Sequence, residues 1–136
     1  MDLSKEFDTA SAAESGAFLH LEHPTTGEKL YDGDTAVGIT LRGQDSRTFR
    51  QASHDISNKR MERQVKKLTA EALERNTREL LAACTVDWQC IEMNGEPLKC
   101  TRENADRLYA ELPWIREQVD AFVSNRANFT GKSKKS

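Results

Sequence analysis

Large apolar side chains are scarce in two stretches of this 136-residue sequence, and this scarcity limits how much of the chain can join one core. Apart from Met1, residues 1–16 contain only Leu3 and Phe7 as sizeable apolar groups, and residues 57–64 contain only Met61. A segment that buries little apolar surface does not offset the entropy lost on ordering it. We therefore expect a disordered acidic tail over 1–16. We also expect a polar helical stretch near 57–67 that projects into solvent or packs against another subunit.

The remaining apolar residues are enough for one modest core. Hydrophobic residues make up 37% of the sequence, below the roughly 45–50% usual in globular domains. The length suits one domain, so we predict a single domain over 17–125 and a flexible basic tail over 126–136. No apolar run approaches the roughly 20 residues that span a bilayer, and an odd number of cysteines, three, suits a reducing compartment. These features predict a soluble cytosolic protein with no membrane partner.

Short alternating runs predict a small antiparallel N-terminal sheet. Residues 17–23 and 36–42 alternate in polarity, and residues 29–31 form a shorter extended run between them. Pro24 to Gly27 and Asp32 to Asp34 separate the three runs with residues that favour turns. We expect the three strands to pair with one another and to present one apolar face.

Helical patterns follow the predicted sheet. Asp45 or Ser46 can cap a helix that runs to about Lys67, and a second helical pattern starts from Thr69. The apolar stripe of the first helix is thin. The sequence leaves open whether residues 46–84 form one bent helix or two.

The C-terminal half combines a hairpin with two further helices. Asn94-Gly95 is a strong signal for a two-residue hairpin turn, because both residues tolerate positive φ. Thr101 is placed to cap a helix, and Pro113 suits the first turn of the last one. The predicted fold class is therefore α+β: a small antiparallel N-terminal sheet and a hairpin packed with three to four helices. The apolar stripe of the last helix consists of Ile115, Val119, Phe122 and Val123.

The formal charge of −2 conceals segments of opposite sign. Residues 1–34 contain two basic and eight acidic residues, whereas residues 42–67 contain eight basic and three acidic ones. Such a basic segment binds an acidic partner, a neighbouring subunit or nucleic acid, or is simply a solvated helix face. Nucleic acid is the less favoured partner because Phe49 is the only aromatic residue among these cations. The candidate partner-binding cations are Arg50, Lys59, Arg60, Arg63, Lys66 and Lys67.

No pattern in the sequence indicates catalysis. His20, His23 and His54 would have to converge from separate elements to bind a metal, and the cysteines lack the paired spacing of zinc sites. Cys100 precedes a helix start, a position that can lower the pKa of a thiol, but no histidine partner is evident. The glycines form no phosphate-binding loop. We therefore expect a binding or assembly protein with no cofactor and no metal, rather than an enzyme.

The C-terminal third carries an ordered series of short motifs. The series comprises Val86-Asp87-Trp88, Ile91, Asn94-Gly95-Glu96-Pro97, Cys100 to Ala105, Leu112 to Val119, Phe122 and Asn125 to Phe129. In this order the motifs resemble the tail assembly chaperones of long-tailed bacteriophages and prophages. The resemblance covers roughly residues 86–129, with weaker support from the predicted N-terminal sheet and the helix around Phe49.

The resemblance implies a small factor in the cytoplasm of a bacterial host that is absent from the mature virion. Proteins of this family bind the long helical tape measure protein, keep it soluble, and help tail tube subunits polymerise around it. In this family a longer, frameshifted product often recruits the tail tube protein. A homo-oligomer is also compatible with the uncovered polar helix.

Trp114, with Ile115 beside it, is the candidate aromatic contact for such a partner. A Trp at the Leu112-Pro113 corner either anchors a partner helix or fills the core of the domain, and the sequence does not separate these two roles. Two other functions are compatible with the sequence. One is a structural tail or head-completion protein that stays in the virion, and the other is a nucleic-acid-binding regulator that uses the basic helix over 46–67.

Overall fold

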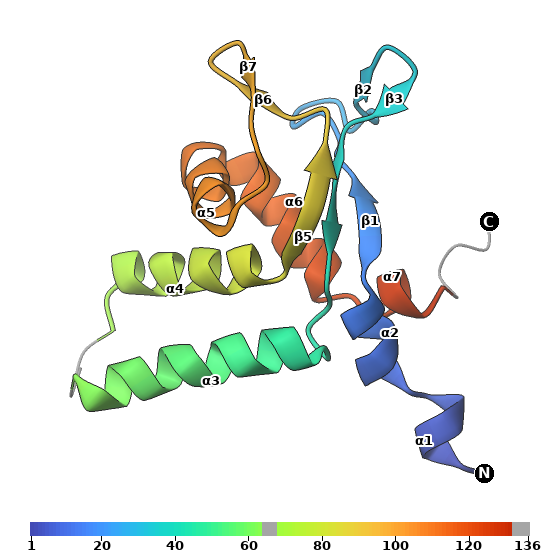
Figure 1. The fold of residues 1–136 in the computed structure, drawn as a ribbon, viewed down its shortest axis with the longest axis vertical. Coiled ribbons are helices and arrows are strands. Elements are labelled where there is room, and N and C mark those ends of the chain that lie inside the picture. The colour runs from blue at the N-terminus through green and yellow to red at the C-terminus, as the bar shows by residue number, and fades with distance from the viewer. Residues whose placement is uncertain (64–67, 132–136) are drawn as a thin grey trace.

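The computed structural model describes residues 1–63 and 68–131, which form an α+β fold (Figure 1). A three-stranded sheet stands at its centre, with two short hairpins at one end and a pair of long helices at the other. The strands are β1 (Ala17–His20), β2 (Tyr31–Asp32), β3 (Thr35–Ala36), β4 (Gly38–Leu41), β5 (Thr85–Gln89), β6 (Glu92–Met93) and β7 (Glu96–Pro97). The helices are α1 (Leu3–Glu6), α2 (Thr9–Ser15), α3 (Arg47–Glu62), α4 (Ala70–Ala83), α5 (Arg102–Glu111), α6 (Pro113–Val123) and α7 (Ala127–Thr130).

The central sheet has the antiparallel order β1-β4-β5. Its first and middle strands were predicted, but its third strand is β5, which comes after the two long helices. The expected third strand around residues 29–31 instead contributes to the short β2–β3 hairpin. The reason is length: β5 pairs along most of β4, so that Trp88 lies opposite Ile39, whereas Tyr31 and Asp32 pair only with Ala36 and Thr35.

The second short hairpin forms as its sequence predicts. Strands β6 and β7 pair antiparallel around Asn94 and Gly95, whose φ angles of 55° and 82° are both positive. Positive φ at both central residues is the requirement of a tight type I′ turn. The turn leads the chain back to Leu98, whose carbonyl accepts a 2.7 Å hydrogen bond from the Trp88 indole N–H.

The core lies between the central sheet and the helices α4, α5 and α6, and α6 crosses behind the sheet in Figure 1. Pro113 occupies the first turn of α6, and the predicted stripe of this helix is buried. Tyr109 of α5 is fully buried, and its hydroxyl lies 2.7 Å from the Thr85 hydroxyl. The largest fully buried side chains are Tyr109, Leu21, Ile39, Leu41, Leu81, Leu108, Val119 and Val123.

The two ends of the chain differ from their prediction. Residues 1–16 were expected to be disordered, but they contain α1 and α2, and Ala13 of α2 is buried. Residues 126–131 were assigned to a flexible tail, but α7 packs beside α2, and its Phe129 ring makes an edge contact with Phe122. The remaining residues of that predicted tail, 132–136, lie outside the described residues. Because alanine side chains are small, α2 packs closely against the rest of the protein. A prediction based only on the number of large apolar side chains does not detect this kind of burial.

Candidate partner-binding site

Helices α3 and α4 form a hairpin that projects from the body of the protein (Figure 1). They are two helices rather than one: α3 ends at Glu62, and α4 starts after its cap, Thr69. The hydroxyl of Ser46 caps α3 by accepting a 3.0 Å hydrogen bond from the Phe49 N–H, and it donates one of 2.6 Å to the Gly43 carbonyl. These hydrogen bonds anchor the base of the hairpin to the body.

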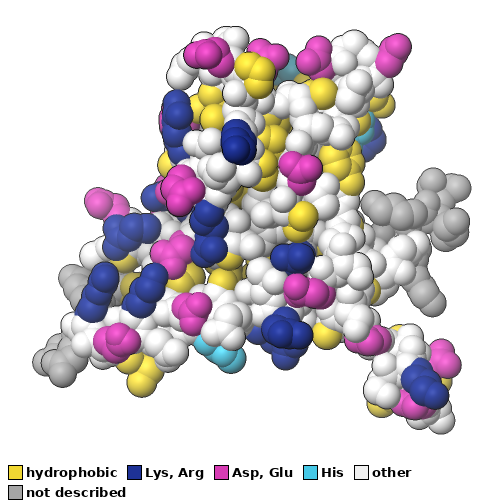
Figure 2. Space-filling view, in the orientation of Figure 1, with side chains coloured by type: hydrophobic (Ala, Val, Ile, Leu, Met, Phe, Trp, Pro, Cys, Tyr) yellow, Lys and Arg dark blue, Asp and Glu magenta, His cyan; other side chains and the backbone are white. Residues whose placement is uncertain are grey.

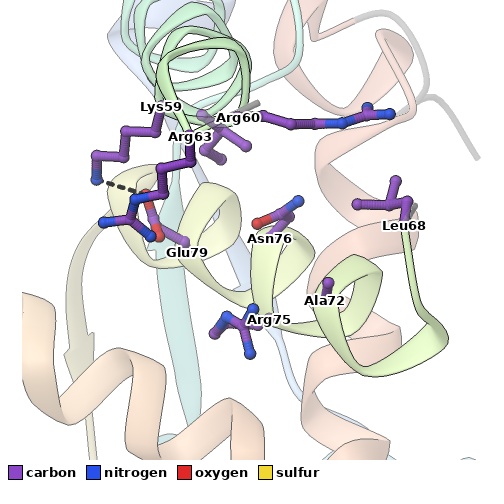
Figure 3. Close-up of a pocket in the computed structure, with 9 residues that line it drawn as sticks. Lys59, Arg60, Arg63, Leu68, Ala72, Arg75, Asn76 and Glu79 are labelled. Carbon is purple, nitrogen blue, oxygen red and sulfur yellow. Dashed lines mark hydrogen bonds and ion pairs between the residues drawn. The ribbon is translucent and has the colours of Figure 1, made fainter. Parts of the chain in front are cut away.

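A groove runs between α3 and α4 near the outer end of the hairpin (Figure 3). Its volume is about 320 Å³. Successive turns of α3 contribute Ile56, Lys59, Arg60 and Arg63. The lining from the other side consists of Leu68, Ala72, Arg75, Asn76 and Glu79.

Three of the candidate cations, Lys59, Arg60 and Arg63, therefore come together in this groove. The other three do not. Arg50 lies on the first turns of α3, away from the groove lining. Lys66 and Lys67 lie outside the described residues.

The groove also contains residues that the sequence analysis did not assign to a site. Leu68, Ala72, Arg75 and Glu79 recur at intervals of three or four, the spacing that places residues on one face of a helix. Applied to the charged residues of α4, this spacing would have indicated a second functional face.

The electrostatics of the groove favour an anionic partner. Lys59 forms an ion pair of 3.5 Å with Glu79, drawn as a dashed line in Figure 3. Within the described part of the chain, no carboxylate forms an ion pair with Arg60, Arg63 or Arg75. The Lys59–Glu79 pair is exposed, and such pairs contribute at most about 1 kcal/mol. A carboxylate on a partner can therefore replace Glu79 at little cost.

Apolar side chains accompany these charges. Ile56, Leu68 and Ala72 are half-buried in the groove. On the same hairpin, Met61 is 75% exposed and Leu73 is 50% exposed. A basic rim around a small apolar surface fits an amphipathic partner better than it fits a small polar anion.

The two C-terminal candidates do not join this groove. Ile115 is 4% exposed, so its predicted role as a surface contact is wrong. Pro113 starts α6 at a position that turns Ile115 toward the core, together with Val119 and Phe122. Trp114 is partly buried and packs against the same core, which agrees with the alternative that it fills the domain interior.

The surroundings of Cys84, Cys100 and His20 are those of structural residues. Burial raises the pKa of the Cys84 thiol to about 12, so the thiol is protonated at neutral pH. The expected lowering of the Cys100 pKa is wrong: partial burial and the nearby Asp87 carboxylate both raise it. The Nε2 of His20 lies 2.7 Å from the Leu30 carbonyl oxygen. Within residues 1–63 and 68–131, no group of three or more His, Cys, Asp or Glu residues is arranged to hold a metal ion.

No family profile matches this chain, no curated protein matches it in sequence, and no solved structure matches it in fold. Across the described residues, no helix combines the length and the apolar character needed to cross a membrane.

Proposed function

We propose that this protein is a tail assembly chaperone of a long-tailed bacteriophage or prophage. It binds the tape measure protein in the host cytoplasm and promotes tail tube polymerisation without catalysing a reaction. The ordered motifs between Val86 and Phe129 support the family, as set out above. The observation that carries the mode of action is the groove between α3 and α4, with its apolar lining and four basic side chains.

The groove suits a segment of an amphipathic helix. A long helical tape measure protein presents apolar stripes that need cover until the tail tube surrounds them. A helix recognised in a groove places its apolar residues inside and its charged residues along the rim. Ile56, Leu68 and Ala72 would contact the apolar stripe, while Arg60 and Arg63 would pair with carboxylates beside it.

Placement on a projecting hairpin supports this role. The outer end of α3 and α4 stands clear of the central sheet, so a long partner can pass across it without meeting the rest of the domain (Figure 1). Figure 2 shows basic side chains on the visible face of this hairpin, interspersed with acidic and apolar ones. Complementary charge of this kind accelerates encounter and selects partners more than it adds affinity.

Charge reversal in the groove tests the proposal. The double variant Arg60→Glu, Arg63→Glu places two carboxylates opposite an acidic partner and should abolish co-purification with the tape measure protein encoded in the same genome. Both arginines are exposed, so the variant should keep the circular dichroism spectrum and denaturation midpoint of the wild type.

The matched control is Lys29→Glu, Lys99→Glu, which makes the same change in charge on exposed residues outside the hairpin. It should retain the tape measure protein. If the wild type, the groove variant and the control all recover the same amount of tape measure protein, the groove does not bind it. Mass spectrometry of purified virions separates a chaperone, which is absent from the particle, from a structural tail or head-completion protein, which is present.

A further inference from the structure

Helix α1 and its flanking residues are exposed on every side. Every residue from Met1 to Asp8 is exposed, and α1 stands apart from the body in Figure 1. Leu3 and Phe7 are 64% and 60% exposed. They are four positions apart, which places them on one side of a helical turn. An isolated helix of four residues is not stable in water by itself, so a short apolar stripe of this kind gains most from a partner surface.

The same segment is acidic. Asp2, Glu6 and Asp8 surround the two apolar residues, with Lys5 as the only basic side chain. The Asp2 carboxylate accepts hydrogen bonds from the Ser4 hydroxyl and the Ser4 N–H, and these bonds lower its pKa. Hydrogen bonds from Ser11 lower the pKa of Asp8 in the same way. Residues 1–8 therefore present two exposed apolar side chains among ionised carboxylates at neutral pH.

This combination is the complement of the α3–α4 groove. The groove offers Ile56, Leu68 and Ala72 as apolar contacts, and its four cations include three without a carboxylate partner among the described residues. Leu3 and Phe7 match the apolar part. Asp2, Glu6 and Asp8 match the basic rim, and they can replace Glu79 beside Lys59.

The segment meets this groove on another copy rather than on its own. Helix α2, which follows α1 directly, is fixed to the base of α3, because the Glu14 carboxylate accepts a 2.9 Å hydrogen bond from the Thr48 hydroxyl. The groove is lined by the last turns of α3, and at 1.5 Å per residue a helix of 16 residues spans about 24 Å. In Figure 1, α1 and the outer end of the hairpin lie on opposite sides of the molecule.

We propose that the acidic segment of residues 1–8 docks into the α3–α4 groove of a second copy of this protein. Because segment and groove lie at opposite ends of α3, an antiparallel pair of copies fills both grooves at once. Such a reciprocal pair has twofold symmetry and closes on itself. The contact uses the groove assigned above to the tape measure protein, so self-association covers that surface until the partner displaces it. The docking itself does not require the proposed function to be correct.

Sedimentation velocity of the full chain alone tests the docking. The wild type should form a dimer that dissociates to monomers on dilution. The affinity of this dimer should also fall as the salt concentration rises from about 50 mM to about 500 mM, because salt screens the charge pairs. Two variants should be monomeric at concentrations where the wild type is dimeric. One is Leu3→Lys, Phe7→Lys, which removes the apolar stripe and adds repulsion. The other is Arg60→Glu, Arg63→Glu, which repels the acidic segment.

Mixing the two variants identifies the contact. The groove of the Leu3→Lys, Phe7→Lys protein and the segment of the Arg60→Glu, Arg63→Glu protein are both intact, so a mixture should regain a dimer with one docked segment and a weaker affinity. The control Lys29→Glu, Lys99→Glu should dimerise like the wild type. A wild type that stays monomeric at every concentration would overturn the proposal. So would variants that dimerise normally, or a mixture that stays monomeric. None of these measurements involves the tape measure protein, so they succeed or fail separately from the proposed function.

Discussion

Gly38 shows how one residue sets the packing of the central sheet. It is the first residue of β4, the middle strand, and its backbone lies under the Phe18 ring of the neighbouring strand β1. A Cβ atom at this position would lie 2.3 Å from the Leu19 carbonyl oxygen and 2.3 Å from the Cζ of Phe18. The Leu19 carbonyl oxygen cannot move away without disturbing the β1–β4 pairing. The absence of a side chain therefore allows the two strands and the ring to approach.

The variant Gly38→Ala should destabilise the fold. An added methyl group that meets a fixed backbone atom forces the strands apart, and overpacking of this kind costs about 1–3 kcal/mol. Urea denaturation followed by circular dichroism should show a lower midpoint with an unchanged slope. A midpoint equal to that of the wild type would mean that β1 shifts freely, contrary to the close packing described above.

At the scale of elements, local signals predicted local structure and failed where the outcome depended on distant partners. Ser46, one of the two candidate caps of α3, and the cap Thr101 are confirmed, as is the start of α4 at its cap, Thr69, because a cap acts on backbone N–H groups two or three residues away. The Asn94-Gly95 turn is confirmed for the same reason. The pairing of β5 with β4 joins residues more than 40 positions apart, and no local pattern specifies it.

The candidate site likewise contains residues that local sequence patterns predicted and residues that they did not. Lys59, Arg60 and Arg63 were proposed because basic residues are concentrated between residues 42 and 67, which is a local property of the sequence. The opposite wall of the groove, with Arg75 and Glu79, depends on how α4 folds back against α3. The spacing of the apolar stripe correctly placed Ile115 on the buried face of α6, whereas its assignment as a partner contact came only from its position beside Trp114.

The contact between α2 and α3 should depend on pH through Glu14. Its carboxylate accepts hydrogen bonds of 3.1 Å from the Thr48 N–H and 2.9 Å from the Thr48 hydroxyl, and it lies 3.4 Å from Arg42. The backbone hydrogen bond from Thr48 is the main cause of a lowered pKa, with smaller contributions from the Thr48 hydroxyl and Arg42. A lowered pKa in the folded state means that the ionised carboxylate stabilises the fold above its unfolded pKa. This contribution disappears as the pH falls through the folded value.

The variant Glu14→Gln should therefore have a lower denaturation midpoint than the wild type near pH 7. The difference should shrink as the pH falls through the lowered folded-state pKa, below which the wild-type carboxyl group is also neutral. Thermal denaturation of both proteins across this pH range measures the effect. A difference in midpoint that stays constant with pH would show that the loss comes from the altered packing of the amide and not from the charge.

At the scale of the whole molecule, the near-zero net charge is a balance between opposite surfaces. The acidic residues before Gly16 lie on or beside α1 and α2, whereas α3 carries Arg47, Arg50, Lys59 and Arg60. The apolar side chains exposed on α1 and on the α3–α4 hairpin lie among these charges. Such an arrangement suits the two proposed contacts, one with a second copy and one with a longer helical partner.

We propose that this protein covers the tape measure protein before tail assembly, and co-expression tests this proposal most directly. The tape measure protein from the same genome is produced in bacteria with the wild type, with Arg60→Glu, Arg63→Glu, or alone. The account predicts a soluble tape measure protein that elutes in one complex with the wild type, and an insoluble one in the other two cultures. A tape measure protein that is equally soluble in all three cultures, and that elutes separately from the wild type, would contradict the claim.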